Sequence, residues 1–212
     1  MHISDGILAQ PALVTGAVAA AAGVALGLRK LDDERIPRVA VLSSAFFVAS
    51  LLPVPLGLSS IHLVLCGLMG VLLGWAAFPA VLIALLLQKL LFGVGGLTTL
   101  GVNTCTMAAP AVVCHYLFGW GVRKRGRRSI FVFGFGAGCL GVLLGAALTC
   151  LALLASGKAF LVVAEAVAVP HLAVAAVEGL ITGYIAGFLR KVKPELLDLH
   201  TTPAGKEECA HA

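Results

Sequence analysis

Residues 130–155 read IFVFGFGAGCLGVLLGAALTCLALLA and closely follow the basic stretch RKRGRR at 123–128. A membrane-spanning helix needs about 20 consecutive, mainly apolar residues, and this uncharged stretch is long enough to cross a bilayer at a tilt. A basic loop beside such a stretch is typical of the cytoplasmic end of a membrane helix. The segment therefore predicts an integral membrane protein.

The composition of the whole chain agrees with this interpretation. Hydrophobic residues make up 60% of its 212 residues and charged residues only 12%, whereas a soluble domain is about 25% charged. The net charge of +5 comes from short basic clusters between apolar stretches. Such basic clusters are typical of the loops of membrane proteins. The sequence shows no basic or aromatic surface of the kind that recognises nucleic acid. We therefore expect the chain to lie in a lipid bilayer and to bind no nucleic acid.

Outward from residues 130–155, the hydropathy pattern predicts six more spans, and therefore an all-α, polytopic bundle of about seven transmembrane helices. The other six lie at about residues 11–28, 39–53, 62–77, 78–92, 104–120 and 168–189. The second, third and fourth spans are shorter than a full crossing requires, so six spans and a half-helix are the alternative. We predict a single transmembrane domain over residues 1–190 and a polar cytoplasmic tail over residues 191–212.

The distribution of lysine and arginine predicts how the chain lies in the membrane. With seven spans and an external N-terminus, every Lys and Arg except Lys89 and Lys158 falls in a cytoplasmic loop or in the C-terminal tail. Cytoplasmic loops of membrane proteins carry an excess of these residues. We therefore predict a multi-pass protein of the cytoplasmic (inner) membrane, with its N-terminus outside and its C-terminus inside.

The N-terminal residues MHISDGIL carry the first candidate for chemistry. They lack the positive n-region of a signal peptide, so we expect Met1 to persist. The free α-amine of Met1, the backbone nitrogen of His2 and the His2 imidazole can close fused chelate rings on one metal ion. Such a planar set of nitrogen donors favours Ni²⁺ or Cu²⁺.

A second histidine, His62, heads the third predicted span on the same side of the membrane as Met1. An ionisable side chain beside a span is a candidate functional residue. The competing interpretations are that His2 belongs to a frayed terminus without function and that His62 is only hydrogen-bonded at an interface. Two histidines that meet, one of them N-terminal, form a more specific arrangement. We therefore take Met1, His2 and His62 as the candidate metal ligands.

Several stretches of the chain resemble one family of membrane proteins. They are MHISDGIL at 1–8, SSIHLVLCGLMGVLLGWAAFPAVLIALLLQ at 59–88, GLTTLGVNTCTMAAPAV at 96–112 and PHLAVAAVEGLITG at 170–183. They are similar to the CbiM/NikM family, the substrate-capturing membrane components of energy-coupling-factor (ECF) transporters for cobalt and nickel. The resemblance extends over about residues 1–190, and its most specific parts are the opening Met-His-Ile and His62.

The resemblance implies a function and a set of partners. The metal would be held by the Met1 amine, the backbone and ring nitrogens of His2, and the His62 imidazole. The opening MHISDG is closer to the nickel branch, MHIPDG, than to the cobalt branch, MHIMEG, although Ser4 stands where proline is common. We therefore expect Ni²⁺ as the transported substrate, with Co²⁺ as the alternative. The implied partners are a membrane coupling subunit, cytoplasmic ABC-type ATPases and a small accessory membrane subunit.

Two residues near the histidines have roles that the sequence leaves open. Asp5 is placed either to accept a hydrogen bond from the His2 ring or to cap a turn with Gly6. Cys66 follows His62 by four residues, which predicts that both lie on one face of a helix. Its thiolate would then add a soft ligand and alter the metal preference. The alternative is that Cys66 is a small packing residue.

Four more polar residues lie in or beside apolar stretches. Asn103 and Thr104 follow the glycine-rich segment, where they either line the outer pocket or form a turn or helix cap. His171 and Glu178 lie on nearly the same face of the last predicted span. Burying Glu178 without a partner would cost several kcal/mol. We therefore expect a structural hydrogen-bond hub there, with an inner metal route as the alternative.

Motifs of other function classes are absent from the sequence. No GxxxxGK[ST] motif provides an ATP site, and no HExxH or Ser/His/Asp arrangement indicates an enzyme. Energy for uphill transport would therefore come from partners, and the basic loops would contact those partners or anionic lipid. A self-sufficient metal channel or secondary carrier is the competing function, although few polar residues continue through the bundle.

Overall fold

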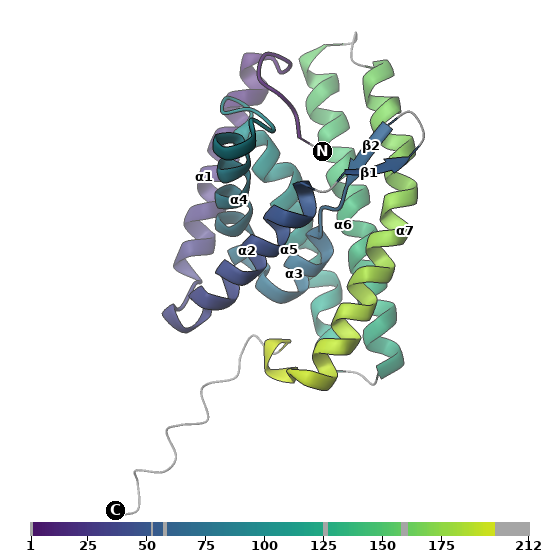
Figure 1. Ribbon diagram of the computed structural model, residues 1–212. Helices are drawn as coiled ribbons and strands as arrows, with labels where there is room; N and C mark the ends of the chain where they lie inside the picture. Colours follow the sequence, from purple (N-terminus) through teal and green to yellow (C-terminus); the bar gives the residue numbers. More distant parts are fainter. Residues whose placement is uncertain (1, 52, 57–58, 125–126, 158–160, 198–212) are drawn as a thin grey trace, which may run out of the picture.

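The computed structural model describes residues 2–51, 53–56, 59–124, 127–157 and 161–197, which are almost entirely helical (Figure 1). The α-helices are α1 (Gln10–Arg29), α2 (Ile36–Leu51), α3 (Cys66–Leu73), α4 (Ala77–Phe92), α5 (Leu100–Lys124), α6 (Arg127–Ser156) and α7 (Leu161–Val192). The short 3-10 helices are η1 (Asp33–Arg35), η2 (Gly74–Ala76) and η4 (Pro194–Leu196). Strands β1 (Pro53–Leu56) and β2 (Ser59–His62) form one antiparallel pair.

Each of the seven predicted segments contains a helix, but the helices differ in length. In the described part of the chain, five helical stretches are long and apolar enough to cross a membrane: 10–29, 66–92, 100–122, 128–156 and 170–192. Helix α2 has only 16 residues and α3 only 8, less than the roughly 20 that a crossing helix needs. The third and fourth predicted spans together form one of the five stretches. These stretches indicate a multi-pass membrane protein.

The prediction of a continuous helix from residue 62 to residue 77 is wrong. His62 ends strand β2, where it is opposite Pro53, and the helix begins only at Cys66. Leu65, directly before α3, has the left-handed φ of 51°, and Gly74, directly after it, has a φ of 58°. A non-glycine residue rarely adopts such a φ, so the chain needs tertiary support to break the helix here.

Glu178 of α7 supplies that support. Its Oε1 accepts hydrogen bonds from the backbone N–H groups of Val64 and Leu65, the latter at 3.0 Å. Irregular backbone at membrane depth is stable only where protein groups satisfy it, because lipid offers no hydrogen bonds. Glu178 and Val64 are both fully buried, at 0% exposure. This contact corresponds to the structural hub expected of Glu178.

Helix α3 lies at the centre of the bundle, and all eight of its residues are buried. It approaches its neighbours closely, since a Cβ atom at Gly67 would collide with the backbone of Ala137 in α6. A Cβ atom at Gly70 would likewise collide with the carbonyl of Ala111 in α5. Small residues permit such close backbone contact between membrane helices. The half-helix is therefore a packed core element.

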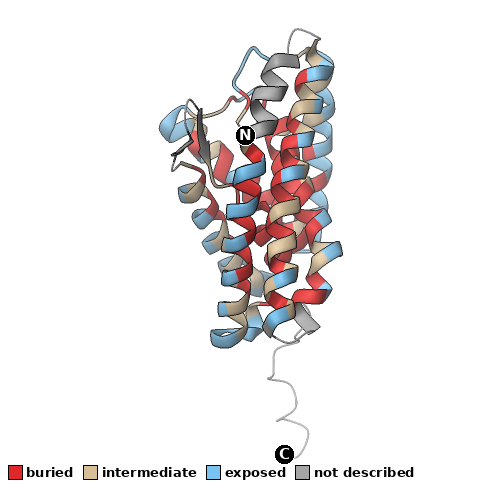
Figure 2. Cartoon of the chain, turned by 90° about the vertical axis from the view of Figure 1, so that its right-hand side faces the viewer, coloured by how far each residue is buried: buried red, intermediate tan, exposed pale blue. Residues whose placement is uncertain are grey.

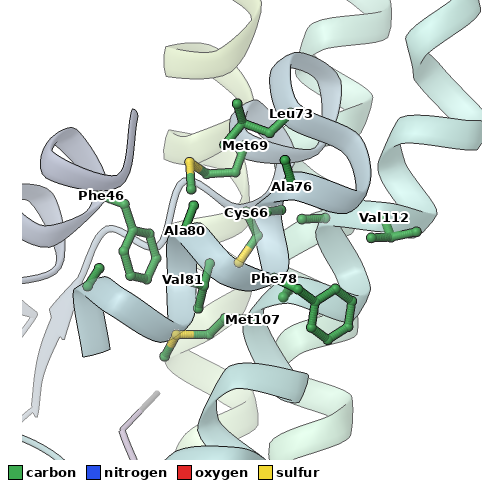
Figure 3. Close-up of a cluster of buried hydrophobic side chains, with 14 of the residues drawn as sticks. Phe46, Cys66, Met69, Leu73, Ala76, Phe78, Ala80, Val81, Met107 and Val112 are labelled. Carbon is green, nitrogen blue, oxygen red and sulfur yellow. The ribbon is translucent and has the colours of Figure 1, made fainter. Parts of the chain in front are cut away.

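A large apolar cluster joins α2, α3, α4 and α5. Figure 3 shows Cys66 in this cluster together with Phe46, Met69, Val81 and Met107. Each of these side chains is at most 2% exposed. The sulfur of Cys66 therefore lies within packed hydrocarbon.

Buried residues line the inside of the bundle and exposed residues its outside (Figure 2), and many of the exposed side chains are large and apolar. Val18 of α1, Leu90 of α4 and Tyr184 of α7 are among the exposed large side chains. Lipid contact explains such a surface. In Figure 1 the β1–β2 pair lies toward the upper end of the bundle, and the α1–α2 connection and the end of α7 lie at its lower end.

Candidate metal site

The N-terminal segment before α1 turns back into the upper end of the bundle, where side chains at the start of α5 hold its backbone (Figure 1). Asn103 Oδ1 accepts from the Ile3 N–H at 3.0 Å, and Asn103 Nδ2 donates to the Ile3 carbonyl at 2.9 Å. The Thr99 hydroxyl donates to the same carbonyl at 2.6 Å. The Ile3 side chain is 5% exposed and packs with Leu8 and other apolar residues. Residues 2 and 3 are therefore fixed against the bundle.

Thr104, predicted together with Asn103 to line or close the outer pocket, has a different role. Its hydroxyl donates to the Leu100 carbonyl one turn earlier in α5, at 2.8 Å. Only Asn103 of this pair bonds to the N-terminal segment.

Asp5 fixes the same segment to the loop between α4 and α5. Its carboxylate accepts from the Thr98 hydroxyl at 2.6 Å, and from the backbone N–H groups of Thr98 and Leu97. Lys89 lies 3.4 Å from the carboxylate. The Thr98 hydroxyl, followed by these other donors, lowers the pKa of Asp5 to about 2. Of the two roles considered for Asp5, accepting a hydrogen bond from the His2 ring is therefore wrong, because Asp5 bonds to this loop and the His2 ring bonds to other residues.

The His2 ring lies between His62 and Gln88. His2 Nδ1 is 3.0 Å from His62 Nε2, and His2 Nε2 is 2.8 Å from the side-chain oxygen of Gln88. Gln88 is fully buried, and its amide nitrogen donates to the Phe47 carbonyl at 3.1 Å and to the Ser50 hydroxyl. Because that nitrogen already donates twice, the Gln88 oxygen accepts from His2 Nε2–H. The Nδ1 atom of a neutral His2 then carries a lone pair.

The facing nitrogens of the two histidines have the geometry of neighbouring metal ligands. The other ring nitrogen of His62, Nδ1, lies 3.4 Å from the Leu63 carbonyl, and the tautomer with its hydrogen on Nδ1 has a lone pair on Nε2. Two nitrogens bound to one metal at about 2.0 Å in a square plane are about 2.8 Å apart. The observed separation of 3.0 Å therefore suits a shared ion.

The protonation of both rings also suits a metal. Burial lowers the pKa of His2 to about 4 and that of His62 to about 2. Both rings are therefore neutral near pH 7, which is the form that binds metal ions. The Nδ1 atom of His2 is also the ring nitrogen that can close a six-membered chelate ring with the backbone nitrogen of the same residue.

The remaining predicted ligands do not join this pair. Met1 lies outside the described residues. Cys66 does not share a helical face with His62, because His62 belongs to β2 and α3 begins at Cys66. Its thiol lies in the apolar cluster of Figure 3, as expected of a packing residue.

His171 and Glu178 are both buried in α7. Within the part of the chain that the structure describes, no group of three or more His, Cys, Asp or Glu side chains is placed to hold an ion. Glu178 bonds to the start of α3 instead. The contacts of Glu178 therefore favour a hydrogen-bonding hub over the inner metal route.

Sequence reasoning missed Gln88, Thr99 and Ser50 as parts of this site. A signal existed for Gln88, because a polar amide within the apolar stretch at 78–92 needs buried partners. Thr99 and Ser50 gave no such signal, since single hydroxyl groups are common in membrane helices and loops. Their roles depend on contacts between segments far apart in the chain.

The fold places this chain among multi-pass membrane proteins whose solved relatives are transition metal transporters. The crystal structure of a truncated transition metal transporter matches this chain with a TM-score of 0.69 and 24% sequence identity. The match covers 90% of this chain and 99% of that transporter. The structure of a second transition metal transporter matches with a TM-score of 0.68 and 25% sequence identity. The match covers 91% of this chain and 93% of that transporter.

Within that class, residues 2–196 match the CbiM family, the cobalt uptake substrate-specific transmembrane region, and the chain belongs to this family. A putative metal transport protein of Haemophilus influenzae is 44% identical, over 93% of this chain and 97% of its own. Putative cobalt transport protein CbiM 1 of Methanocorpusculum labreanum is 33% identical, over 98% of this chain and 96% of that protein. The fused nickel transport protein NikMN of Rhodobacter capsulatus is 34% identical, over 98% of this chain and 67% of that protein. The predicted CbiM/NikM membership is thus confirmed.

Proposed function

We propose that this chain is the substrate-specific component of an ECF transporter and captures Ni²⁺ from outside the cytoplasmic membrane. Partner subunits would then drive uptake with ATP. One observation carries the proposal: His2 Nδ1 and His62 Nε2 face each other at 3.0 Å. The Met1 amine and the His2 backbone nitrogen would complete a set of four nitrogen donors around the ion.

The donor set supports nickel over cobalt. Four nitrogens in one plane suit Ni²⁺, which accepts square-planar geometry, better than Co²⁺. The names of the relatives do not separate the metals, because both cobalt and nickel transport proteins occur among them. Cobalt is therefore the alternative substrate at the same site.

The distribution of charge supports an external N-terminus. Arg29 and Lys30 end α1, and Arg190 and Lys191 end α7, both at the end of the bundle opposite the His2–His62 pair. Basic residues gather on the cytoplasmic side of membrane proteins. The histidine pair would then lie at the outer end, where it meets external metal.

The proposed partners supply what this chain lacks. The sequence contains no P-loop, so ATP hydrolysis belongs to cytoplasmic ATPases linked through a membrane coupling subunit. The fused NikMN relative extends beyond the matched region, which covers 67% of its length. We propose a small accessory membrane subunit as a further partner of this chain.

The direct test measures nickel and cobalt binding to the purified chain in detergent, by calorimetry and absorption spectroscopy. Native protein is expected to bind Ni²⁺ with a square-planar spectrum, and His62→Ala to bind at least about a hundredfold more weakly. His200→Ala, in the polar tail, is the matched control and should bind like native protein. Unchanged binding by His62→Ala would place the site elsewhere.

Transport assays separate this function from a stand-alone channel or carrier. Liposomes that contain only this chain are expected to show no nickel flux, because the proposed component depends on its partners. Flux through the chain alone would favour the competing function.

Asn103→Leu is expected to weaken nickel binding about tenfold to a hundredfold, as the loss of a residue that orients a metal ligand does. The substitution removes both hydrogen bonds to the Ile3 backbone and thereby loosens the adjacent His2. Thr104→Val is the matched control, since the Thr104 hydroxyl bonds only within α5. Calorimetry of both variants checks the prediction, which an equal loss in the two would contradict.

Nickel affinity is expected to fall as the pH is lowered, by about two decades per pH unit between about pH 7 and pH 5. One proton leaves the α-amine, whose ordinary pKa is about 8, and one leaves the His2 backbone amide. His2 and His62 release none, because burial lowers the pKa of His2 to about 4 and of His62 to about 2. Calorimetry across this range gives the slope. A slope near four would mean that both rings also titrate there.

A further inference from the structure

A second site lies at the lower end of the bundle, opposite the histidine pair. The end of α1, η1, the start of α2, η2 and the middle of α5 surround a cavity of about 490 Å³. Its lining includes three cationic side chains, Lys30, Arg35 and Arg38, and one acidic side chain, Asp32. The cavity therefore has an excess of positive charge.

Two contacts inside the cavity involve its charged side chains. Arg35 pairs with Asp32 at 3.5 Å, which offsets one of the three cations. The Lys30 ammonium lies 5.1 Å from the centre of the Trp75 ring, a cation–π contact that holds the charge beside the cavity without neutralising it. With three cationic side chains and one acidic side chain in its lining, the cavity is suited to a ligand that carries a negative charge.

The walls of the cavity are aromatic and apolar. Trp75 Nε1 donates to the Tyr116 hydroxyl at 2.8 Å, and Val39, Leu72 and Leu73 also line the cavity. Tyr116 is 62% exposed on the outer face of α5. Tryptophan and tyrosine concentrate where a membrane protein meets the lipid headgroups. The cavity therefore reaches the lipid-facing surface at headgroup depth.

We infer that this cavity binds the headgroup of an anionic phospholipid, with the phosphate among Lys30, Arg35 and Arg38. Basic pockets between helices on the cytoplasmic side hold such headgroups. The apolar wall favours lipid over an acidic protein segment, because it offers a surface for the glycerol and the start of the acyl chains. This inference is independent of the metal site and would stand if that site proved wrong.

The test is a lipid titration of the full-length, detergent-solubilised chain, in which native mass spectrometry measures the bound lipid. Phosphatidylglycerol and phosphatidylcholine with identical acyl chains are compared, and native protein is expected to retain the anionic lipid preferentially. The double variant R35Q/R38Q should lower phosphatidylglycerol affinity about thirtyfold, since each basic residue near an anionic headgroup contributes about fivefold. R190Q/K193Q removes the same charge at the same end outside the cavity and should change affinity less than about threefold.

Two further variants protect the interpretation against misfolding. R35K/R38K keeps both charges and should bind within about fivefold of native protein, and K30Q alone should weaken binding about fivefold. Circular dichroism checks that each variant is folded. Equal losses in the two double-glutamine variants, or equal binding of the two lipids, would overturn the inference. Displacement of phosphatidylglycerol by stoichiometric inorganic phosphate or by a short polyglutamate peptide would also overturn it, in favour of a free-phosphate or protein site.

Discussion

Extending the chain by four residues before Met1 is expected to weaken nickel binding at least about a thousandfold, or about 4 kcal/mol, while the protein stays folded. The extension converts the Met1 amine into a peptide nitrogen and so removes a basic donor and one chelate ring. The fold should persist, because the Asn103 and Thr99 contacts to Ile3 involve neither the amine nor the His2 ring. Calorimetry and the square-planar absorption band measure the loss.

The length of the extension matters for this experiment. A single added residue would move the histidine to the third position, where the new amine, two backbone nitrogens and the ring form another planar chelate. Four added residues avoid this. Ser4→Ala, an exposed change in the same segment, is the matched control and should bind like native protein. Native affinity in the extended chain would show that the terminal amine is not a ligand.

Glu178→Leu is expected to destabilise the protein by about 2–6 kcal/mol. The change leaves the Val64 and Leu65 N–H groups buried without an acceptor, and each such group costs about 1–3 kcal/mol. Nickel binding should weaken as well, because these amides fix the backbone directly after His62. Thermal unfolding in detergent and nickel calorimetry measure the two effects.

Glu178→Gln separates a structural role from a transport role. An amide oxygen can still accept from both N–H groups, so this variant should keep most of the stability and most of the nickel affinity. If Glu178 instead formed part of an inner metal route, Glu178→Gln would be stable and bind nickel but would fail in transport by the assembled system.

The sequence was a good guide to where the helices lie, because hydropathy reports the length and polarity of a segment directly. It could not reveal that α3 is a half-helix. The break depends on the left-handed Leu65 and on a carboxylate 114 residues further along the chain from Val64. No local pattern carries that information, so His62 appeared to begin a helix when it ends a strand.

The sequence indicated the candidate donor atoms of the site, but not the contacts that hold the donor residues in place. The chelating capacity of an N-terminal Met-His is a property of two adjacent residues and can be read without a fold. Asn103 was singled out by its residue type, but the Ile3 backbone to which it bonds lies 100 residues away and could not be predicted. Neither role considered for Asp5 included its donors at Leu97 and Thr98, because they belong to a loop whose path the sequence does not show.

The contact between Glu178 and the start of α3 also has a consequence for how the protein is made. Synthesis begins at the N-terminus, so His2 and His62 leave the ribosome long before Glu178 does. Until α7 enters the membrane, the amides of Val64 and Leu65 lack their acceptor, and the backbone beside His62 stays unfixed. On the proposed function, the first residues to be translated would complete their metal site only after α7 has been inserted, and a chain cut short before α7 is expected to bind nickel more weakly.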